Sequence, residues 1–157
     1  MVRMRSRVQA PIVAPFLFLE QTMLKAAKVL IKNSQGEYLA LYRNNHPRFG
    51  GSIDLPGGTV EKSEQLEDAA IREVYEEAGI QLTADMLHLI ITSRKYSRVG
   101  NEYSLYEATL QDTPPVVLSW EHSAFTWLSK EDFIKEALVT NDMFLRMAGD
   151  MLQQDEQ

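Results

Sequence analysis

The 157-residue sequence contains no cysteine. This absence excludes disulfide bonds, thiolate zinc sites and cysteine nucleophiles, although it does not identify the cellular compartment. Internal repeats and low-complexity tracts are also missing. The apolar run at residues 10–19 is too short to span a bilayer. We therefore expect no membrane association and predict a cytoplasmic protein.

Basic residues are in the minority, with 16 Lys and Arg against 22 Asp and Glu, for a formal net charge of −6. Non-specific nucleic-acid binding needs a basic surface, so we expect no DNA binding. An acidic protein also repels polyanionic substrates unless metal ions mediate the contact. The charge is therefore compatible with a metal-dependent enzyme that acts on phosphates.

The length and a hydrophobic content of 45% predict one domain with a proper core. We assign it to residues 24–157 and treat residues 1–23 as an N-terminal extension. Three arginines precede the apolar run there, which loosely resembles a secretory signal. However, Pro11 and Pro15 interrupt the run, and no clear cleavage site follows it.

Periodicity and turn residues predict a mixture of strands and helices, which makes the chain an α+β or α/β domain. We expect two hairpins, one with a turn at residues 33–36 and one with a turn at Gly100-Asn101. Ser129 is the predicted N-cap of a helix. The predicted strands are 24–32, 37–43, 52–55, 87–99, 102–111, 116–118 and 124–128, and the predicted helices are 64–78, 130–137 and 141–152.

The segment from Gly58 to Ile80, GTVEKSEQLEDAAIREVYEEAGI, is the most informative part of the chain. Glu73, Glu76 and Glu77 have i, i+3 and i+4 spacing, so a helix brings their carboxylates to one side. Like charges so close repel each other, and a hard divalent cation such as Mg²⁺ removes the repulsion. The spacing indicates a metal site, with a solvated acidic helix face as the alternative.

A helical wheel favours the metal site. Leu66, Ala70 and Val74 form an apolar stripe, and Glu73 and Glu77 lie within about 40° of Leu66. Carboxylates that face the body of a protein are costly unless something neutralises them.

The limits of this helix are predicted from its capping residues. Ser63 is the expected N-cap, Glu64 suits the positive N-terminal end, and Gly79 suits the left-handed C′ position. Before the helix, Pro56-Gly57-Gly58 predicts a loop whose backbone can come close to a ligand.

These residues match a known signature at every specified position: Gly58, five residues, Glu64, seven residues, then Arg72-Glu73-Val74-Tyr75-Glu76-Glu77-Ala78-Gly79-Ile80. The segment resembles the Nudix box of the Nudix hydrolases (MutT-like). The resemblance covers residues 24–138 and implies the Nudix fold, a mixed β-sheet sandwiched between α-helices.

The resemblance implies hydrolysis of a diphosphate linkage in a nucleoside diphosphate derivative, with Mg²⁺ as cofactor and Mn²⁺ as a substitute. Nucleoside triphosphates and dinucleoside polyphosphates are the favoured substrates. ADP-ribose is less favoured, because the proline often found about fifteen residues past the box in that group is missing. The alternatives are a non-catalytic nucleotide-binding sensor and an RNA 5′-end pyrophosphohydrolase. An isoprenoid diphosphate isomerase would need a cysteine.

Carried over by position, the resemblance gives metal ligands at Glu73, Glu76 and Glu77, a backbone carbonyl of Gly57 or Gly58, and Glu64 as an auxiliary ligand. Arg72 would orient Glu73 rather than touch substrate.

The general base is either Glu77 or Glu121, which lies in a loop before a predicted strand. Arg43 and Tyr96 are the candidate substrate contacts. His122 is a candidate lining residue, and a homodimer is an open alternative. Other residues weighed for phosphate or pocket contacts are His46, Arg48, His88, Arg94, Lys95 and Arg98.

Overall fold

The computed structural model describes residues 23–44 and 51–154. Predictions that concern residues 1–22, His46 and Arg48 lie outside this part of the chain. The strands are β1 (Lys25–Lys32), β2 (Tyr38–Arg43), β3 (Ile53–Asp54), β4 (Gly57–Thr59), β5 (His88–Ser93), β6 (Glu102–Thr109) and β7 (His122–Leu128). The helices are α1 (Leu66–Ala78), α2 (Lys130–Val139), α3 (Met143–Gln154) and a short 3₁₀ helix, η1 (Ala84–Met86).

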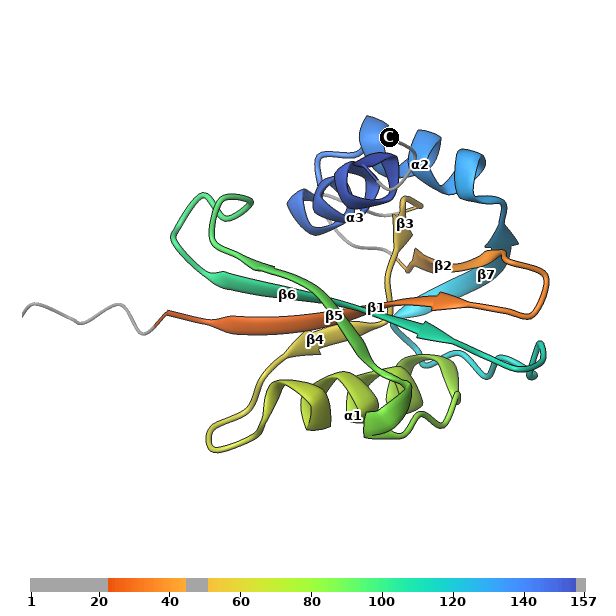
Figure 1. Cartoon of the computed structure of the whole chain (residues 1–157), viewed down its shortest axis with the longest axis horizontal. Helices are drawn as coiled ribbons and strands as arrows, with labels where there is room; N and C mark the ends of the chain where they lie inside the picture. The colour runs from red at the N-terminus through yellow and green to blue at the C-terminus, as the bar shows by residue number, and fades with distance from the viewer. Residues whose placement is uncertain (1–22, 45–50, 155–157) are drawn as a thin grey trace, which may run out of the picture.

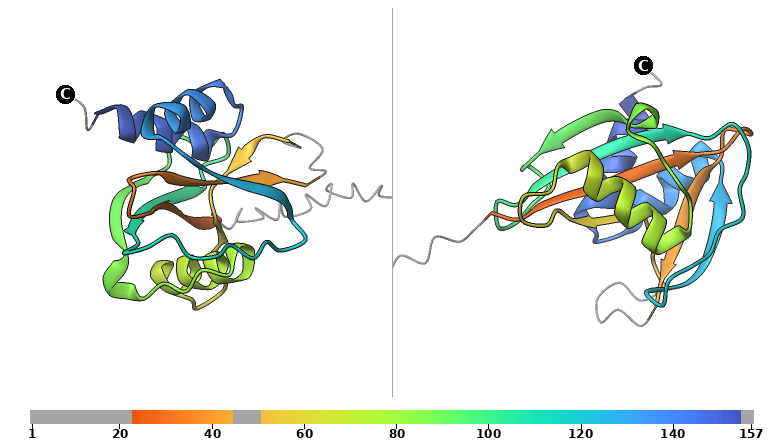
Figure 2. Two further views of the ribbon diagram at one scale, coloured as in Figure 1. Left: turned by 90° about the vertical axis from the view of Figure 1, so that its right-hand side faces the viewer. Right: turned by 90° about the horizontal axis from the view of Figure 1, so that it is seen from below.

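The strands form one mixed sheet with the order β3-β2-β1-β6-β5, while β4 also pairs with β1 and β7 with β2. The central β1–β6 pair is parallel, and the other pairs are antiparallel. Helix α1 covers one face of the sheet, and α2 and α3 cover the other (Figure 1; Figure 2 shows the same layers from two further sides). The predicted α+β fold, a mixed sheet between helices, is confirmed.

Strand β1 separates two hydrophobic layers. Leu30 packs with residues of α2 and α3, whereas Val29 and Ile31 pack with residues of α1. Successive side chains of a strand point to opposite faces, so this alternation is the period of two expected for a central strand. Full burial of each such side chain contributes about 1.5 to 3 kcal/mol, which anchors both helical layers to the strand.

One edge of β1 is shared between two strands. Its first half pairs with β4, at Ala26–Lys28, and its last residue, Lys32, pairs with β2. The whole opposite edge pairs with β6. Residues from β1, β2 and β4, among them Lys28, Arg43 and Gly57, line the candidate site.

Helix α1 begins at Leu66, two residues later than predicted, and the expected Ser63 cap is wrong. Gln65 occupies the N-cap position without a side-chain cap. Ser63 has φ 69°, and the Glu64 carboxylate accepts a hydrogen bond from the Glu61 N–H at 2.9 Å. Glu64 therefore closes a turn before the helix. At the other end, Gly79 has φ 68° and its N–H bonds to the Tyr75 carbonyl, as expected for a C-terminal glycine.

Three other predictions need correction. Gly57–Thr59 is a short strand rather than a loop, because it pairs with β1. The strand predicted at residues 87–99 ends at Ser93, since the Ser97 hydroxyl accepts backbone hydrogen bonds that close a turn before β6. Residues 116–118 form no strand; the Val117 N–H instead bonds to the Ala78 carbonyl at the end of α1.

Both predicted C-terminal helices are present: α2 begins at Lys130 as predicted, whereas α3 begins and ends two residues later than predicted. The Ser129 hydroxyl accepts from the Asp132 N–H at the start of α2. Asp142 caps α3, with Oδ1 accepting from the N–H groups of Phe144 and Leu145 at 2.8 and 3.2 Å. None of the helices in the described residues is both long enough and apolar enough to cross a membrane.

Candidate active site

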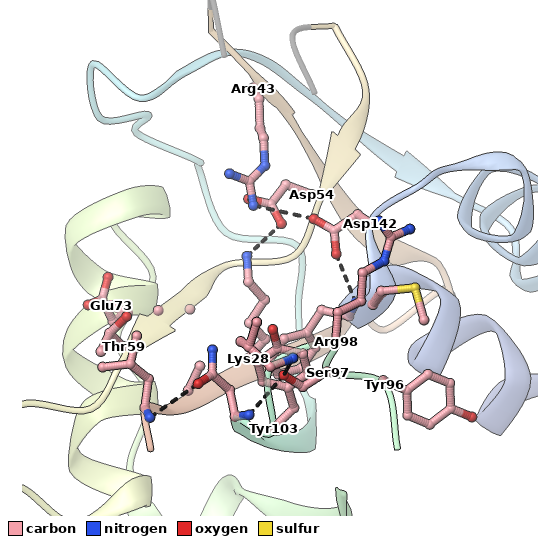
Figure 3. Close-up of a pocket in the computed structure, with 18 of the residues that line it drawn as sticks. Lys28, Arg43, Asp54, Thr59, Glu73, Tyr96, Ser97, Arg98, Tyr103 and Asp142 are labelled. Atoms are coloured by element: carbon pink, nitrogen blue, oxygen red, sulfur yellow. Dashed lines mark hydrogen bonds and ion pairs between the residues drawn. The ribbon is translucent and has the colours of Figure 1, made fainter. Parts of the chain in front are cut away.

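A cavity of about 1130 Å³ lies between β4, the start of α3 and the turn that joins β5 to β6 (Figure 3). Polar and charged side chains from segments that are far apart in the sequence line it. Its lining includes Lys28, Arg43, Asp54, Gly57, Gly58, Glu73, Glu77, Arg98, Tyr103, Glu121, Asp142 and Phe144. Carboxylates and cations thus face the same space.

The predicted metal ligands divide into two groups. Glu73 and Glu77 line the cavity with the backbone of Gly58. Glu64 and Glu76 are not among its lining residues, and the Glu76 side chain is 56% exposed. Two of the four acids of the box therefore face the cavity in this conformation.

Arg72 holds the other acids together. Its guanidinium donates to Glu64 at 2.8 and 3.0 Å, to Glu73 at 2.8 Å and to Glu76 at 3.4 Å. The hydrogen bonds from Arg72 and the Glu61 N–H lower the pKa of Glu64 to about 2, and the hydrogen bonds to Glu64 and Glu73 together with their charges raise the pKa of Arg72. Arg72 thus donates to the Glu73 oxygen Oε1 and fixes the direction of that carboxylate.

Glu77 is the most buried acid of the helix, at 7% exposure. Its Oε2 accepts a hydrogen bond from the Gly57 N–H at 2.9 Å. Burial raises the pKa of Glu77 to about 7, although the charge of Lys28 and the Gly57 hydrogen bond oppose the shift. The ionised carboxylate is therefore short of positive charge, which a bound cation would supply.

The glycine pair leaves room for these carboxylates. A Cβ at Gly58 would lie 2.7 to 2.9 Å from the Glu73 carboxylate, so only glycine permits this approach. Carboxylate and backbone oxygens are the ligands that Mg²⁺ prefers, and this donor set fits such an ion. Within residues 23–44 and 51–154, no three acidic or histidine side chains yet converge as a preformed metal cluster. Glu76 would have to leave Arg72 to join Glu73 and Glu77.

A buried ionic cluster, which sequence reasoning missed, forms the opposite wall. Asp54, at 3% exposure, accepts from Lys28 Nζ at 2.5 Å and pairs with Arg43 Nη2 at 2.8 Å. Asp142 lies 3.6 Å from the same Arg43 nitrogen, and His122 Nε2 lies 3.5 Å from Asp54. We call these five residues the cation cluster.

Electrostatics keep Asp54 charged. Burial alone would raise its pKa, but the charge of Lys28, the hydrogen bond from His122 and the charge of Arg43 together hold the pKa well below the usual value. The available signal was a lone lysine inside the apolar strand Ala26-Ala27-Lys28-Val29-Leu30-Ile31 and an aspartate in Ile53-Asp54-Leu55. Neither pattern reveals that the two side chains meet.

Glu121 reaches the cavity from the loop before β7. Two hydrogen bonds tie this loop to the end of α1: Val117 N–H to the Ala78 carbonyl and Ser119 N–H to the Glu77 carbonyl. The Glu121 carbonyl also accepts from the Asn44 N–H at 2.7 Å. Glu121 therefore shares the cavity with Glu73 and Glu77 although it is distant in sequence.

The predicted substrate contacts have different surroundings. Arg43 lines the cavity but is engaged by Asp54 and Asp142. The Tyr96 ring is mostly buried, and its hydroxyl donates to Asp150 of α3 at 2.8 Å. Burial and this hydrogen bond raise the pKa of Tyr96 to about 12. Tyr96 thus ties the β5–β6 turn to α3 (Figure 3).

Another aromatic pair was not predicted. The Tyr103 and Phe144 rings stack with centroids 4.8 Å apart, and both residues line the cavity. Arg98 lines it too, whereas Arg94 pairs with Glu102 and the Lys95 ammonium lies over the Tyr96 ring. His88 is exposed on β5.

Comparison with known proteins gives consistent results. A NUDIX domain family model matches residues 23–146. The CTP pyrophosphohydrolase of Escherichia coli (strain K12) is 26% identical over 121 residues, which are 77% of this chain and 87% of that protein. Three other curated relatives align over only 29% to 34% of their own length.

Solved structures share the fold. The MutT protein from Methanosarcina mazei Go1 has a TM-score of 0.67 and 26% identity, covering 88% of this chain and 99% of that chain. An Ap4A hydrolase binary complex from C. elegans has a TM-score of 0.65 and 26% identity, covering 83% and 95%.

Proposed function

The chain belongs to the NUDIX domain family and is a hydrolase that acts on diphosphate bonds, and we propose that its substrate is a nucleoside diphosphate derivative cleaved with Mg²⁺. Nucleoside triphosphates and dinucleoside polyphosphates are the favoured substrates. The proposal rests on one observation: Glu73, Glu77 and Glu121 line a single cavity that is also lined by the buried Lys28 and the partly buried Arg43.

Divalent ions such as Mg²⁺ are general for this family. Here Glu73, Glu77 and the Gly58 carbonyl would hold the ion, with Glu76 joining after it leaves Arg72. The bound ion would neutralise phosphate oxygens and the charge that develops on the leaving group. Arg72 keeps Glu73 directed, through the 2.8 Å hydrogen bond to its Oε1.

The reaction needs a water molecule, a proton acceptor and a leaving group. The water oxygen attacks phosphorus, the P–O bond of the anhydride breaks, and the second phosphate leaves as an anion. Glu121 accepts the proton of the water in this proposal, because it lines the cavity and is exposed to solvent. Glu77 is the competing base, since its pKa of about 7 suits proton transfer near neutral pH.

The far end of the cavity suits the nucleoside. Tyr103 and Phe144 present a stacked aromatic pair, and the Arg98 guanidinium lies on the neighbouring turn. Planar groups stack on aromatic rings and on guanidinium planes. A volume of about 1130 Å³ accommodates a mononucleotide derivative with its ions.

A nucleotide panel tests the proposal. Purified protein is incubated with Mg²⁺ and nucleoside triphosphates, dinucleoside polyphosphates, ADP-ribose or triphosphorylated RNA, and released phosphate and pyrophosphate are measured. We expect turnover that EDTA abolishes and that Glu73→Gln lowers by about 10³-fold.

The control is Asp68→Asn, which removes an exposed carboxylate from the first turn of the same helix, outside the cavity. It should turn over like the wild type. Nucleotide binding without any product release would identify the sensor function instead. Equal rates for Glu73→Gln and the wild type would refute the proposed metal site.

A further inference from the structure

Lys28 is a charged residue in the middle of an apolar strand, and its side chain enters the cavity. Its exposure is 7%. Burial of an ammonium group is costly unless it is paired. The pairing alone gives little reason for a lysine here, because a buried ion pair is often no more stabilising than apolar side chains of similar volume.

The lysine has a defined position. Its Nζ donates to Asp54 Oδ1 at 2.5 Å and to the Leu55 carbonyl at 2.8 Å. Gly57 makes room for its stem, because a Cβ there would lie 2.6 Å from Lys28 Cα and 2.9 Å from Cγ. Two hydrogen bonds to described residues leave one of the three ammonium N–H groups for a ligand.

Lys28 lies next to the acidic side of the cavity, which Glu73 and Glu77 form. Lys28 pairs across the sheet with Gly57, and the Gly57 N–H donates to Glu77 at 2.9 Å. Figure 3 shows the Lys28 ammonium directed toward Asp54, with Arg43 beyond Asp54 and Glu73 on helix α1 at the left. Among the cations that line the cavity, Lys28 is the most buried, and its strand partner Gly57 is hydrogen-bonded to Glu77.

A diphosphate bound between these walls would present oxygens to both of them. The oxygens that face the carboxylates need a metal ion, and those that face β1 need hydrogen-bond donors. We propose that Lys28 binds a non-bridging oxygen of the substrate diphosphate and that Asp54 is the positioning residue that holds the Lys28 ammonium in place. This assignment rests on the proposed function, and it adds a phosphate contact that lies outside the Nudix box.

The test uses inorganic pyrophosphate as the probe, with Ca²⁺ as the cation, in calorimetric titrations of the whole protein. Lys28→Met keeps the aliphatic stem and removes the charge. We expect its dissociation constant for pyrophosphate to rise by about 10- to 100-fold, as for loss of a charge-assisted hydrogen bond. Binding of Ca²⁺ alone should not weaken, because the metal carboxylates are untouched.

Lys32→Met is the matched control. Lys32 is on the same strand and the same face as Lys28 and is also ion-paired, with Glu107 at 3.3 Å, but it does not line the cavity. It should bind pyrophosphate like the wild type. If Lys28→Met does not fold, the double variant Lys28→Met with Asp54→Asn removes both buried charges and should show the same loss of pyrophosphate affinity.

The outcomes separate the two proposals. Wild-type turnover of a nucleotide together with an unchanged pyrophosphate constant in Lys28→Met would overturn the role of Lys28 alone. Equal weakening of Ca²⁺ and pyrophosphate binding would also overturn it, because a general structural defect affects both ligands. Failure of the wild type to bind pyrophosphate or hydrolyse any nucleotide would overturn both proposals.

Discussion

Asp54 and Glu77 are two buried carboxylates of the same cavity, with exposures of 3% and 7%, and their pKa values are displaced in opposite directions. Two fixed cations and the Leu55 N–H surround Asp54. One backbone N–H bonds to Glu77, and Lys28 contributes only its more distant charge. Burial alone therefore does not decide the charge of a carboxyl group; the positive charge close to it does.

The two walls therefore differ in kind. Cations of the protein itself neutralise the charge of Asp54, so the residues around Asp54 can act as a rigid support. Too little positive charge surrounds Glu77, so its carboxylate is neutralised only when a cation binds. Variants at Asp54, Glu77, Gly58 and Asp142 test this difference between the two walls.

Replacement of Asp54 should have the largest effect on stability. Asp54→Asn leaves the buried Lys28 and the partly buried Arg43 beside a neutral amide, and removal of one partner from a buried pair costs about 4 kcal/mol. Urea unfolding at pH 7 measures this loss of unfolding free energy. Because the folded pKa of Asp54 lies below the ordinary pKa of 3.8, its contribution is present above that pH and is lost as the pH falls below it.

Asp112→Asn is the control for Asp54→Asn, since Asp112 is exposed in a loop. It should change the unfolding free energy by less than about 0.5 kcal/mol. A comparable loss in both variants would mean that the cation cluster does not hold Asp54 in its charged form.

Replacement of Glu77 should change the unfolding free energy in the opposite direction and stabilise the protein. Its folded pKa of about 7 exceeds the ordinary glutamate pKa of 4.5, so the wild type loses stability as the pH rises from 4.5 to 7. Glu77→Gln removes this penalty. In EDTA at pH 8 it should be more stable than the wild type by up to about 3 kcal/mol, and the two should converge near pH 4.

The effect of Mg²⁺ on stability is a second test of the role of Glu77. Mg²⁺ should raise the unfolding free energy of the wild type more than that of Glu77→Gln, because binding to the folded state alone stabilises it. Glu136→Gln, an exposed residue of α2, serves as the control and should follow the wild type at every pH. A wild-type profile that stays flat between pH 4.5 and 7 would contradict the raised pKa of Glu77.

The two walls also differ in how far sequence could predict them. Glu73 and Glu77 lie on one helix, and Gly58 lies shortly before it, so helical geometry and local spacing were sufficient. The cation cluster joins β1, β2, β3, the β7 edge and the start of α3. Its assembly depends on the strand order, which local spacing does not contain.

Errors in the predicted elements have a similar cause. The helix start was placed too early because Ser63 has the residue type of a cap, whereas long-range bonds from Arg72 draw Glu64 into a separate turn. The predicted strand at 87–99 was too long because Tyr96 and Val99 favour strands, yet Tyr96 bonds to Asp150 of α3 instead. Tertiary contacts override local propensity in both cases.

Replacement of Gly58 should have an intermediate effect, which is limited to metal binding by Glu73. In Gly58→Ala the new methyl group would displace the Glu73 carboxylate, the mobile end of a side chain. The fold should survive, while the dissociation constant for Mg²⁺ should rise by about 10- to 100-fold, as for other residues that orient a ligand. Titration calorimetry measures this constant.

Gly36→Ala, in the β1–β2 turn with φ 81°, is the control for Gly58→Ala. It should cost about 1 kcal/mol of stability because of its left-handed backbone, without any change in Mg²⁺ affinity. Unchanged Mg²⁺ binding in Gly58→Ala would show that Glu73 does not need its approach to the glycine.

The smallest effect is expected at the outer end of the cation cluster. Asp142 caps α3 through Oδ1, while Oδ2 lies 3.6 Å from Arg43. Asparagine caps a helix about as well as aspartate, and a partly exposed pair at this distance contributes little. Asp142→Asn should therefore cost about 0.5 kcal/mol, and Asp142→Ala about 1 kcal/mol more, in urea unfolding. Equal costs would mean that Asp142 contributes through its charge facing Arg43 rather than through the helix cap. The stabilising ion pairs around Asp54 would then extend to α3.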